Sequence, residues 1–207
     1  MYSTNGSAGN QNWQTEYDRV LTMSKHAMDT AGASILKGFP DAYTYSKRMA
    51  EEMLDRVNRS GGNVPPIPMV FFRPSILAAA DSEPVPGWTD TQGLLSGMTL
   101  AVGLGVMKDT PGNPDSTFDA IPVDYVARQL LVSIPFAKAQ ALNSQGREPL
   151  FILQSATSGA NPITAMKFFK DMITYMNNFP YEKRAGVAQL TMHRDVAAYE
   201  RAFRYRS

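Results

Sequence analysis

Residues 41–72 read DAYTYSKRMAEEMLDRVNRSGGNVPPIPMVFF and contain the two elements on which the fold class rests. Apolar side chains recur at every fourth position from 45 to 57, which predicts an amphipathic helix with Asp41 as its N-cap. The Ser-Gly-Gly-Asn sequence at 60–63 ends this helix. The apolar run at 67–72 has no polar alternation, which is typical of a strand buried on both faces of a parallel sheet.

A second helix and strand follow in the same order. Asp124 could cap the helix, and residues 149–154 (PLFILQ) form another uninterrupted apolar run. A third amphipathic helix opens at Pro162, a favourable residue in a first turn. The expected apolar stripes are Val126, Leu130, Leu131 and Ile134 in the earlier helix, and Ile163, Met166, Phe169, Ile173 and Met176 in the later one. Alternating helices and buried strands predict an α/β layered fold.

The beginning of a nucleotide-binding fold is not found in this sequence. Such a fold opens with a strand, a glycine-rich turn and a helix whose N-terminus holds the pyrophosphate. The glycines at 61–62 and at 103 and 105 do not follow a strand in that way. We therefore expect the C-terminal half of a Rossmann-like, doubly wound parallel sheet that lacks the glycine-rich N-terminal half.

The remaining segments carry weaker signals. An irregular helix is expected over 15–33, and residues 78–120 are rich in glycine and proline and predict a long irregular segment. We expect a partial reductase-like domain over 1–180 and a basic C-terminal helix over 181–207. The basic residues of that helix are Lys183, Arg184, Arg194, Arg201, Arg204 and Arg206. They form either a solvated helix face or a docking surface for an acidic partner.

Composition excludes several classes of protein. The 207 residues carry 20 Lys and Arg against 19 Asp and Glu, so there is no electrostatic case for a nucleic-acid partner. Cysteine is absent, and the two histidines, His26 and His193, lack metal-ligand spacing, so no metal site is predicted. The longest uncharged stretch, 91–107, is interrupted by glycines, and no transmembrane segment is predicted.

Tyr43 and Lys47 lie four positions apart at the start of the best-defined helix, so their side chains share one face. This pair has a specific chemical use, because an ammonium stabilises a phenolate and the tyrosine can then pass a proton to a carbonyl oxygen as hydride arrives. Spacing alone is weak evidence, since many helices carry Tyr and Lys at this separation without any such role.

The surrounding sequence resembles the fatty acyl-CoA reductases, which are extended short-chain dehydrogenase/reductase proteins with a male-sterility-type NAD(P)-binding domain. The resemblance covers about residues 36–164 in six blocks that occur in the family's order. The blocks are FPDAYTYSK at 39–47, FRPSI at 72–76, PVPGWTD at 84–90, GMTLAVGLGV at 97–106, IPVD at 121–124 and SATSGANPIT at 155–164.

The resemblance implies NADPH-dependent reduction of a long-chain fatty acyl-CoA to a fatty alcohol. In that role Tyr43 is the proton donor, and Lys47 stabilises its phenolate and hydrogen-bonds the nicotinamide ribose. The resemblance also implies that Tyr2-Ser3-Thr4 is a remnant of the strand that carries the family's catalytic hydroxyl, which makes Thr4 the third catalytic candidate.

The resemblance also implies contacts outside the catalytic pair. The Arg73-Pro74-Ser75 stretch would lie beside the nicotinamide, where backbone amides can hold its carboxamide; the alternative is a plain turn that ends the strand. Trp88 either contacts the acyl substrate or anchors its own loop.

The absent glycine-rich half leaves the expected parallel strands without their inner partners. We therefore expect a fragment of a longer reductase, or one piece of a split enzyme whose sheet is completed by another protein chain. The alternative is a non-catalytic, reductase-derived accessory subunit of a larger assembly. Family members work on peroxisomal or endoplasmic-reticulum membranes, but this sequence contains no readable targeting signal.

Overall fold

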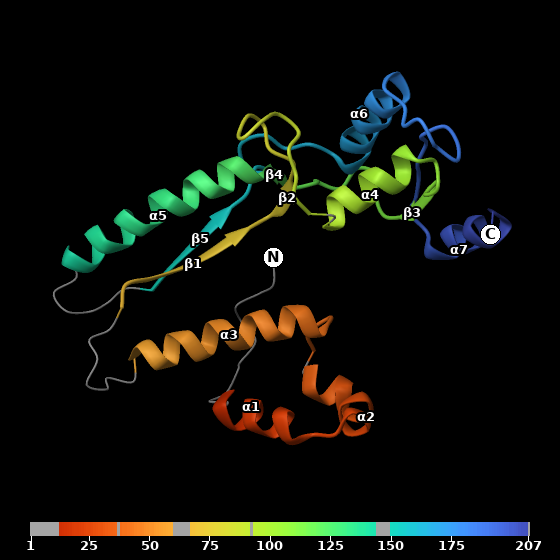
Figure 1. The fold of residues 1–207 in the computed structure, drawn as a ribbon. Helices are drawn as coiled ribbons and strands as arrows, with labels where there is room; N and C mark the ends of the chain where they lie inside the picture. Colours follow the sequence, from red (N-terminus) through yellow and green to blue (C-terminus); the bar gives the residue numbers. More distant parts are fainter. Residues whose placement is uncertain (1–12, 37, 60–66, 92, 144–149, 207) are drawn as a thin grey trace. The chain divides into compact units, whose positions relative to one another are not determined.

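The computed structural model groups the chain into two compact units, and each is described here by itself. The N-terminal unit consists mainly of helices and includes the starts of two strands, and the second unit contains the rest of these strands and all the others (Figure 1). The structure describes residues 13–36, 38–59, 67–91, 93–143 and 150–206.

Two helices replace the single irregular helix expected over 15–33. They are α1 (Trp13–Thr22) and α2 (Lys25–Leu36). The break between them arises because Ser24 acts as a cap: its hydroxyl accepts the backbone N–H of Ala27 at 3.2 Å. A serine at this point competes for the backbone and starts a new helix, which apolar spacing alone did not indicate.

The predicted helix after Asp41 is confirmed as α3 (Ala42–Arg59). The Asp41 carboxylate accepts the backbone N–H of Thr44 at 2.7 Å, as an N-cap does. Tyr45 is buried at the centre of the unit's core, but Val57 at the other end of the expected stripe is exposed. The core consists of Ile35 and Tyr45, with Val20, Met23, Ala31, Leu36, Phe39, Met49 and Met53 packed against them.

Three short pairs of strands give the chain its mixed α/β class and fit a partial Rossmann-like fold. The pairs are β1 (Met69–Pro74) with β5 (Leu150–Ser155), β2 (Ile76–Ala78) with β4 (Ala120–Pro122), and β3 (Asp109–Pro111) with β6 (Thr191–His193). The second and third pairs are parallel, and β1 and β5 run in the same direction (Figure 1).

The apolar runs predicted as strands are strands, with shifted bounds. β1 starts two residues later than the predicted run and continues to Pro74, and β5 is displaced by one residue. Most of their side chains are half-buried, so the expectation that both strands are buried on both faces is wrong for the described part of the chain.

The segment 78–120 is more regular than its glycine and proline content indicated. It contains β2, β3, β4 and an additional helix, α4 (Leu94–Gly103), whose Val102 is fully buried. Glycines within α4 lower its intrinsic helix propensity, so its formation depends on packing. Gly103 shows this packing: an added Cβ would lie 2.9 Å from Tyr181 Cε2 and 3.1 Å from Met176 Sδ.

The end of α4 closely approaches a segment 81 positions later in the chain. Gly105 has φ of +73°, and a Cβ added there would lie 2.6 Å from the carbonyl carbon and oxygen of Gly186. The Leu104 carbonyl accepts the backbone N–H of Ala185 at 2.8 Å. Gly105 is therefore required both by backbone conformation and by the space available.

Helix α5 (Val123–Asn143) turns a different face inward from the one expected. Its buried residues are Asp124, Val126, Ser133 and Ala137, whereas Leu130, Leu131 and Ile134 are exposed by 47%, 69% and 63%. Only the first residue of the expected stripe is correct. Residues 126, 133 and 137 lie on one face at helical spacing, and the bulkier residues fall on another.

Two further helices complete the second unit. In α6 (Ala165–Asn178) the predicted stripe is confirmed from Met166 onward, since Phe169 is buried and its stripe neighbours are half-buried. The helix begins later than predicted, because the Thr164 hydroxyl provides the N-cap and Pro162 and Ile163 precede it. The last helix, α7 (Val196–Arg206), is shorter than expected: residues 181–190 are not helical and β6 precedes it. Among the described residues, no helix combines the length and apolarity needed to cross a bilayer.

Candidate functional site

The catalytic pair predicted from the sequence lies on the first turns of α3. Lys47 Nζ is 5.4 Å from the centroid of the Tyr43 ring, so the cation lies near the aromatic face. Tyr43 is 69% exposed, and Lys47 is exposed as well. The Asp41 cap fixes the start of the helix, and the pair therefore has a defined backbone position and side chains accessible to a ligand.

The Arg73-Pro74-Ser75 stretch lies at the end of β1, where the sequence placed it. The backbone N–H of Ser75 is already committed, because it donates to the Ser155 carbonyl at 2.8 Å and extends the pairing of β1 with β5. Pro74 has no N–H to give. The expected role of the amides at 74 and 75 in holding a carboxamide therefore does not fit this geometry.

A turn after β5 is fixed by Asp119, which sequence analysis did not select. The Asp119 carboxylate accepts the backbone N–H and hydroxyl of Thr157, at 2.9 and 3.1 Å, and the backbone N–H of Ser158 at 3.3 Å. Desolvation raises the pKa of Asp119, but the hydrogen bonds from Ser158 and Thr157 outweigh it and hold the pKa well below its ordinary value. The carboxylate ties β4 to the SATSGANPIT block.

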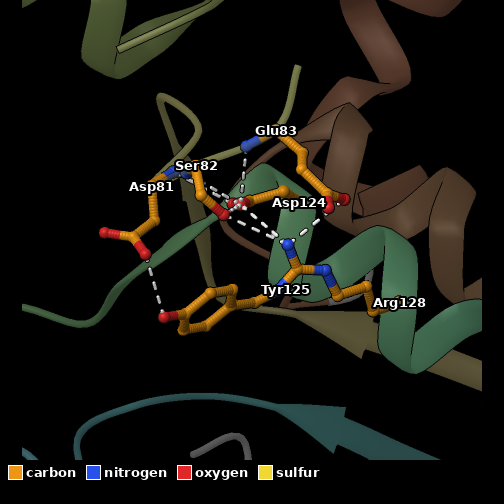
Figure 2. A network of polar contacts seen from close by, with 6 residues as sticks. All are labelled: Asp81, Ser82, Glu83, Asp124, Tyr125 and Arg128. Atoms are coloured by element: carbon orange, nitrogen blue, oxygen red, sulfur yellow. Dashed lines mark hydrogen bonds and ion pairs between the residues drawn. The ribbon is translucent and has the colours of Figure 1, made fainter. Parts of the chain in front are cut away.

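The Asp124 side chain does not cap α5 as expected but fixes a loop about 40 residues earlier in the chain (Figure 2). Its two oxygens accept the backbone N–H groups of Asp81, Ser82 and Glu83 at 3.1, 3.1 and 3.3 Å. The Ser82 hydroxyl adds a contact at 3.1 Å. The reason is positional: Asp124 is the second residue of α5, inside the helix rather than before it, and its carboxylate points to the loop.

These contacts keep the Asp124 carboxylate ionised although the residue is buried. Desolvation raises its pKa, and the backbone N–H groups of Asp81, Ser82 and Glu83 together outweigh that penalty and lower it well below the ordinary value. A carboxylate that accepts several backbone N–H bonds is the arrangement that favours the charged form most strongly.

Two other α5 residues join this network (Figure 2). The Arg128 guanidinium contacts Glu83 at 3.2 Å and Asp124 at 3.7 Å, and it donates to the Ser82 hydroxyl at 3.1 Å. The Tyr125 hydroxyl donates to the Asp81 carboxylate at 3.1 Å, a contact that raises the pKa of Tyr125. The loop is thus held to α5 by side chains from three positions of that helix.

A pocket of about 530 Å³ lies between this loop and α5. Trp88, which the sequence offered as a substrate contact or a loop anchor, is one of the residues that line it. Its full lining consists of Glu83, Pro84, Trp88, Val123, Asp124, Ala127, Arg128 and Leu131.

The loop that carries Trp88 is closed by its own backbone. The Ala80 N–H donates to the Trp88 carbonyl at 2.9 Å, and the Gly87 N–H donates to the Ala80 carbonyl at 2.8 Å. Gly87 adopts φ of +81°, a conformation that glycine permits and other residues rarely adopt. The Trp88 backbone thus closes the loop, and the same residue lines the pocket.

The structure brings Tyr43 together with Lys47, and Trp88 together with the Asp124 network; these two groups belong to different units. Thr4 lies outside the described residues. In the part of the chain that the structure describes, no group of three His, Asp or Glu side chains is placed to hold a metal ion. His193 instead pairs with Asp109, with its Nε2 at 2.7 Å from a carboxylate oxygen.

Comparison with known proteins agrees with the sequence blocks. Among curated proteins, the chain is 26% identical over 185 residues to fatty acyl-CoA reductase wat of Drosophila melanogaster, covering 89% of this chain and 34% of that protein. It is 28% identical over 172 residues to probable fatty acyl-CoA reductase 5 of Arabidopsis thaliana (83% and 32%) and 25% identical over 193 residues to fatty acyl-CoA reductase 2 of Homo sapiens (92% and 35%).

The chain spans about a third of the length of these curated relatives. The family model described as male sterility protein, an NAD-binding model, matches residues 1–130. That match includes α3 with its Tyr/Lys pair, β1, the Trp88 loop and the first two turns of α5. The relatives support a reductase family, and the chain belongs to the NAD-binding male sterility protein family.

Proposed function

We propose that this chain carries the acid–base part of an NADPH-dependent reductase that converts long-chain fatty acyl-CoA to fatty alcohol. A glycine-rich nucleotide-binding half, from an adjoining segment or another protein chain, would complete the enzyme. The observation that carries the proposal is the pairing of Tyr43 with Lys47 on an exposed face of α3, within a chain whose named relatives are fatty acyl-CoA reductases.

The chemistry requires a hydride at the carbonyl carbon and a proton at the carbonyl oxygen, once for the thioester and once for the aldehyde. Between the two reductions the reduced thioester, a hemithioacetal, breaks its C–S bond, the hydroxyl proton passes to sulfur, and coenzyme A leaves as the free thiol. Bound NADPH would supply the hydride. The Tyr43 hydroxyl donates the proton, and the Lys47 ammonium stabilises the phenolate left behind. The exposure of both side chains allows a carbonyl group to approach the Tyr43 hydroxyl.

The residues present fit one end of the cofactor better than the other. The Lys47 ammonium is exposed and has donors suited to the hydroxyls of the nicotinamide ribose. At the 73–75 stretch, side chains and carbonyls rather than the amides at 74 and 75 would make the nicotinamide contacts. Among the described residues no glycine-rich turn joins a strand to a helix N-terminus, so the proposed second half would hold the pyrophosphate.

Thr4 is proposed as the third catalytic residue. Its hydroxyl would donate a hydrogen bond to the substrate carbonyl and orient it toward Tyr43. Thr4→Val would then lower kcat.

The test is NADPH oxidation with palmitoyl-CoA by the protein purified from its source, with its partner chains retained. Tyr43→Phe should lower turnover at least about 100-fold, because general acid catalysis contributes roughly 10²–10⁴ to the rate. Lys47→Ala should lower it as well. Tyr175→Phe, at another exposed tyrosine on α6, is the matched control and should retain activity. Full turnover in Tyr43→Phe would overturn the proposal.

A second candidate function is a non-catalytic accessory subunit of a larger assembly. Leu130, Val132 and Ile134 on α5 are exposed, and an assembly partner would bury such a surface. Native mass spectrometry of the purified material distinguishes the two candidates. A bound chain together with the mass of NADP supports the reductase, whereas a large complex without dinucleotide supports the accessory subunit.

A further inference from the structure

We propose that the 179–187 loop, which lies between α6 and β6, docks an acidic segment of a partner protein (Figure 1). This surface is independent of the proposed function, because docking requires neither NADPH nor turnover. The sequence left two interpretations of the basic C-terminal residues, a solvated helix face and a docking surface. In the structure these residues fall into two groups that differ in their ion pairs.

The first group consists of arginines in α7 and just before it, and these are paired with carboxylates of the same chain. The pairs are Arg201 with Asp195 at 3.9 Å, Arg204 with Glu200 at 3.8 Å, and Arg194 with Asp115. Their charges are already compensated within the chain. This group therefore fits a solvated helix face.

The second group lies in the loop and has no such partners. Lys183 and Arg184 are exposed, and neither forms an ion pair with any residue that the structure describes. A third cation is close to them, because the Lys108 ammonium lies 3.9 Å from the position of a Cβ added at Gly186. Glu182 is the only carboxylate of the loop sequence, so the loop and its surroundings carry an excess of positive charge. Carboxylates of a partner would compensate that excess.

Exposed aromatic and apolar side chains accompany these cations in the loop. Phe179 and Val187 are both exposed. The Phe179 ring contacts that of Tyr175, with the two centroids 5.0 Å apart. Tyr181 packs against Gly103, where an added Cβ would lie 2.9 Å from the Tyr181 Cε2. Aromatic residues next to an arginine are the composition of the central contacts in protein interfaces.

The loop is anchored to the rest of the second unit. The Leu104 carbonyl accepts the backbone N–H groups of Ala185 and Gly186, at 2.8 and 3.3 Å. Directly after the loop, the Asn177 side chain donates to the Ala188 carbonyl at 2.9 Å and accepts the Ala188 N–H at 3.1 Å. A partner therefore binds a backbone that is already ordered, which lowers the entropy cost of binding.

The charge and the packing of the loop favour a protein segment over a lipid surface. Anionic lipids recruit clusters of about four to eight Lys and Arg residues, more than the loop and Lys108 provide together. The Phe179 and Tyr181 rings pack against the protein rather than standing free to enter a bilayer. An acidic segment matches this surface better, because one of its carboxylates can take both prongs of the Arg184 guanidinium while its apolar side chains contact Phe179.

The test is a titration of the full chain into a fluorescein-labelled peptide of repeated Glu-Glu-Leu units, followed by fluorescence anisotropy. We expect saturable binding that weakens as salt is added, because exposed charges are screened. Peptides of the same length built from Gln-Gln-Leu or Lys-Lys-Leu units should bind much more weakly. A non-saturable response to the acidic peptide, or equal affinity for the Gln-Gln-Leu peptide, would overturn the proposal.

Two double variants remove the same charge from the loop and from α7. Lys183→Ser with Arg184→Ser should weaken binding of the acidic peptide roughly tenfold, because two exposed ion pairs with the peptide are lost. Arg201→Ser with Arg204→Ser is the matched control and should change the affinity less than about twofold, because these arginines already have partners. Equal losses in the two double variants would show that net charge, and not the loop, attracts the peptide.

A pair of single variants tests the aromatic contact in the same way. Phe179 and Phe203 are exposed by 67% and 59%, so neither Phe179→Ala nor Phe203→Ala should unfold the protein. Only Phe179→Ala should weaken binding of the acidic peptide, by roughly fivefold. Equal affinities of these two variants would contradict a contact at Phe179.

Co-sedimentation with vesicles of phosphatidylcholine and phosphatidylserine distinguishes a lipid surface from a protein segment. We expect the unsubstituted chain to remain in the supernatant. Binding to these vesicles that disappears in Lys183→Ser with Arg184→Ser would identify the loop as a lipid contact and refute the proposal.

Discussion

Each unit contains an aspartate whose carboxylate accepts backbone N–H groups, but the sequence separations between the partners differ greatly. In the helical unit, the Asp41 carboxylate accepts a backbone N–H three residues away and starts α3. In the second unit, the Asp124 carboxylate accepts three backbone N–H groups more than 40 positions earlier in the chain. The first contact is a local capping motif, and the second is a tertiary contact that shapes a pocket. A carboxylate near a helix start therefore does not by itself reveal its partner.

Two glycines with positive φ, one in each unit, repeat this contrast between a local and a tertiary constraint. Their substitution is expected to have the largest effect on stability. Gly38 before α3 has φ of +88° with no atom within 4 Å of an added Cβ, whereas at Gly105 a Cβ would meet the backbone of Gly186 at 2.6 Å. Gly38→Ala should cost about 1 kcal/mol from conformation alone. Gly105→Ala should cost about 3 kcal/mol, because overpacking adds to the strain.

The measurement is the free energy of unfolding in urea for both variants under one set of conditions. The critical result is which of the two variants loses more free energy of unfolding. Equal losses would mean that the close approach of Gly105 to Gly186 does not constrain the second unit.

The two aspartates give the next largest difference. Asp124→Asn replaces one acceptor oxygen with a donor facing backbone N–H groups, and it leaves buried polar groups unpaired. Asp41→Asn changes an exposed cap for which Asn is nearly as good. We expect the melting temperature to fall by several degrees in Asp124→Asn and to change little in Asp41→Asn. A larger fall in Asp41→Asn would contradict the tertiary role assigned to Asp124.

Acid should produce the smallest of these effects. The pKa values of Asp119 and Asp124 are lowered in the folded state from an ordinary value of 3.8, so each contributes stability that is fully present above that value. The contribution is lost as pH falls from about 5 toward 2, because the unfolded chain takes up protons first. The free energy of unfolding, measured between about pH 5 and pH 2, should fall less steeply in Asp119→Asn and in Asp124→Asn than in the unsubstituted chain.

Local features of the fold were predictable from the sequence. The α3 helix with its Asp41 cap, the runs that became β1 and β5, and the stripe of α6 depend on residues close together in the chain. Apolar period and capping chemistry are sufficient for such elements.

The features that were missed depend on distant partners. Helix α4 has a glycine-containing sequence and forms against α6, and the inward face of α5 is set by its neighbours rather than by its bulkiest residues. The same holds at the candidate sites. The spacing of Tyr43 and Lys47 predicted their shared face, but nothing local indicated that Asp119 and Asp124 would hold loops from elsewhere in the chain.

The parallel pairing of β3 with β6 has a consequence for the chain during its synthesis. Thr191 pairs with Asp109 across about 80 residues. At ribosomal rates of about 5–20 residues per second, β3 is synthesised roughly 4–16 seconds before its partner strand. During that interval the β3 edge is open to other nascent chains. The short length of β3 and the charge of Asp109 at its start make it a poor template for such mispairing.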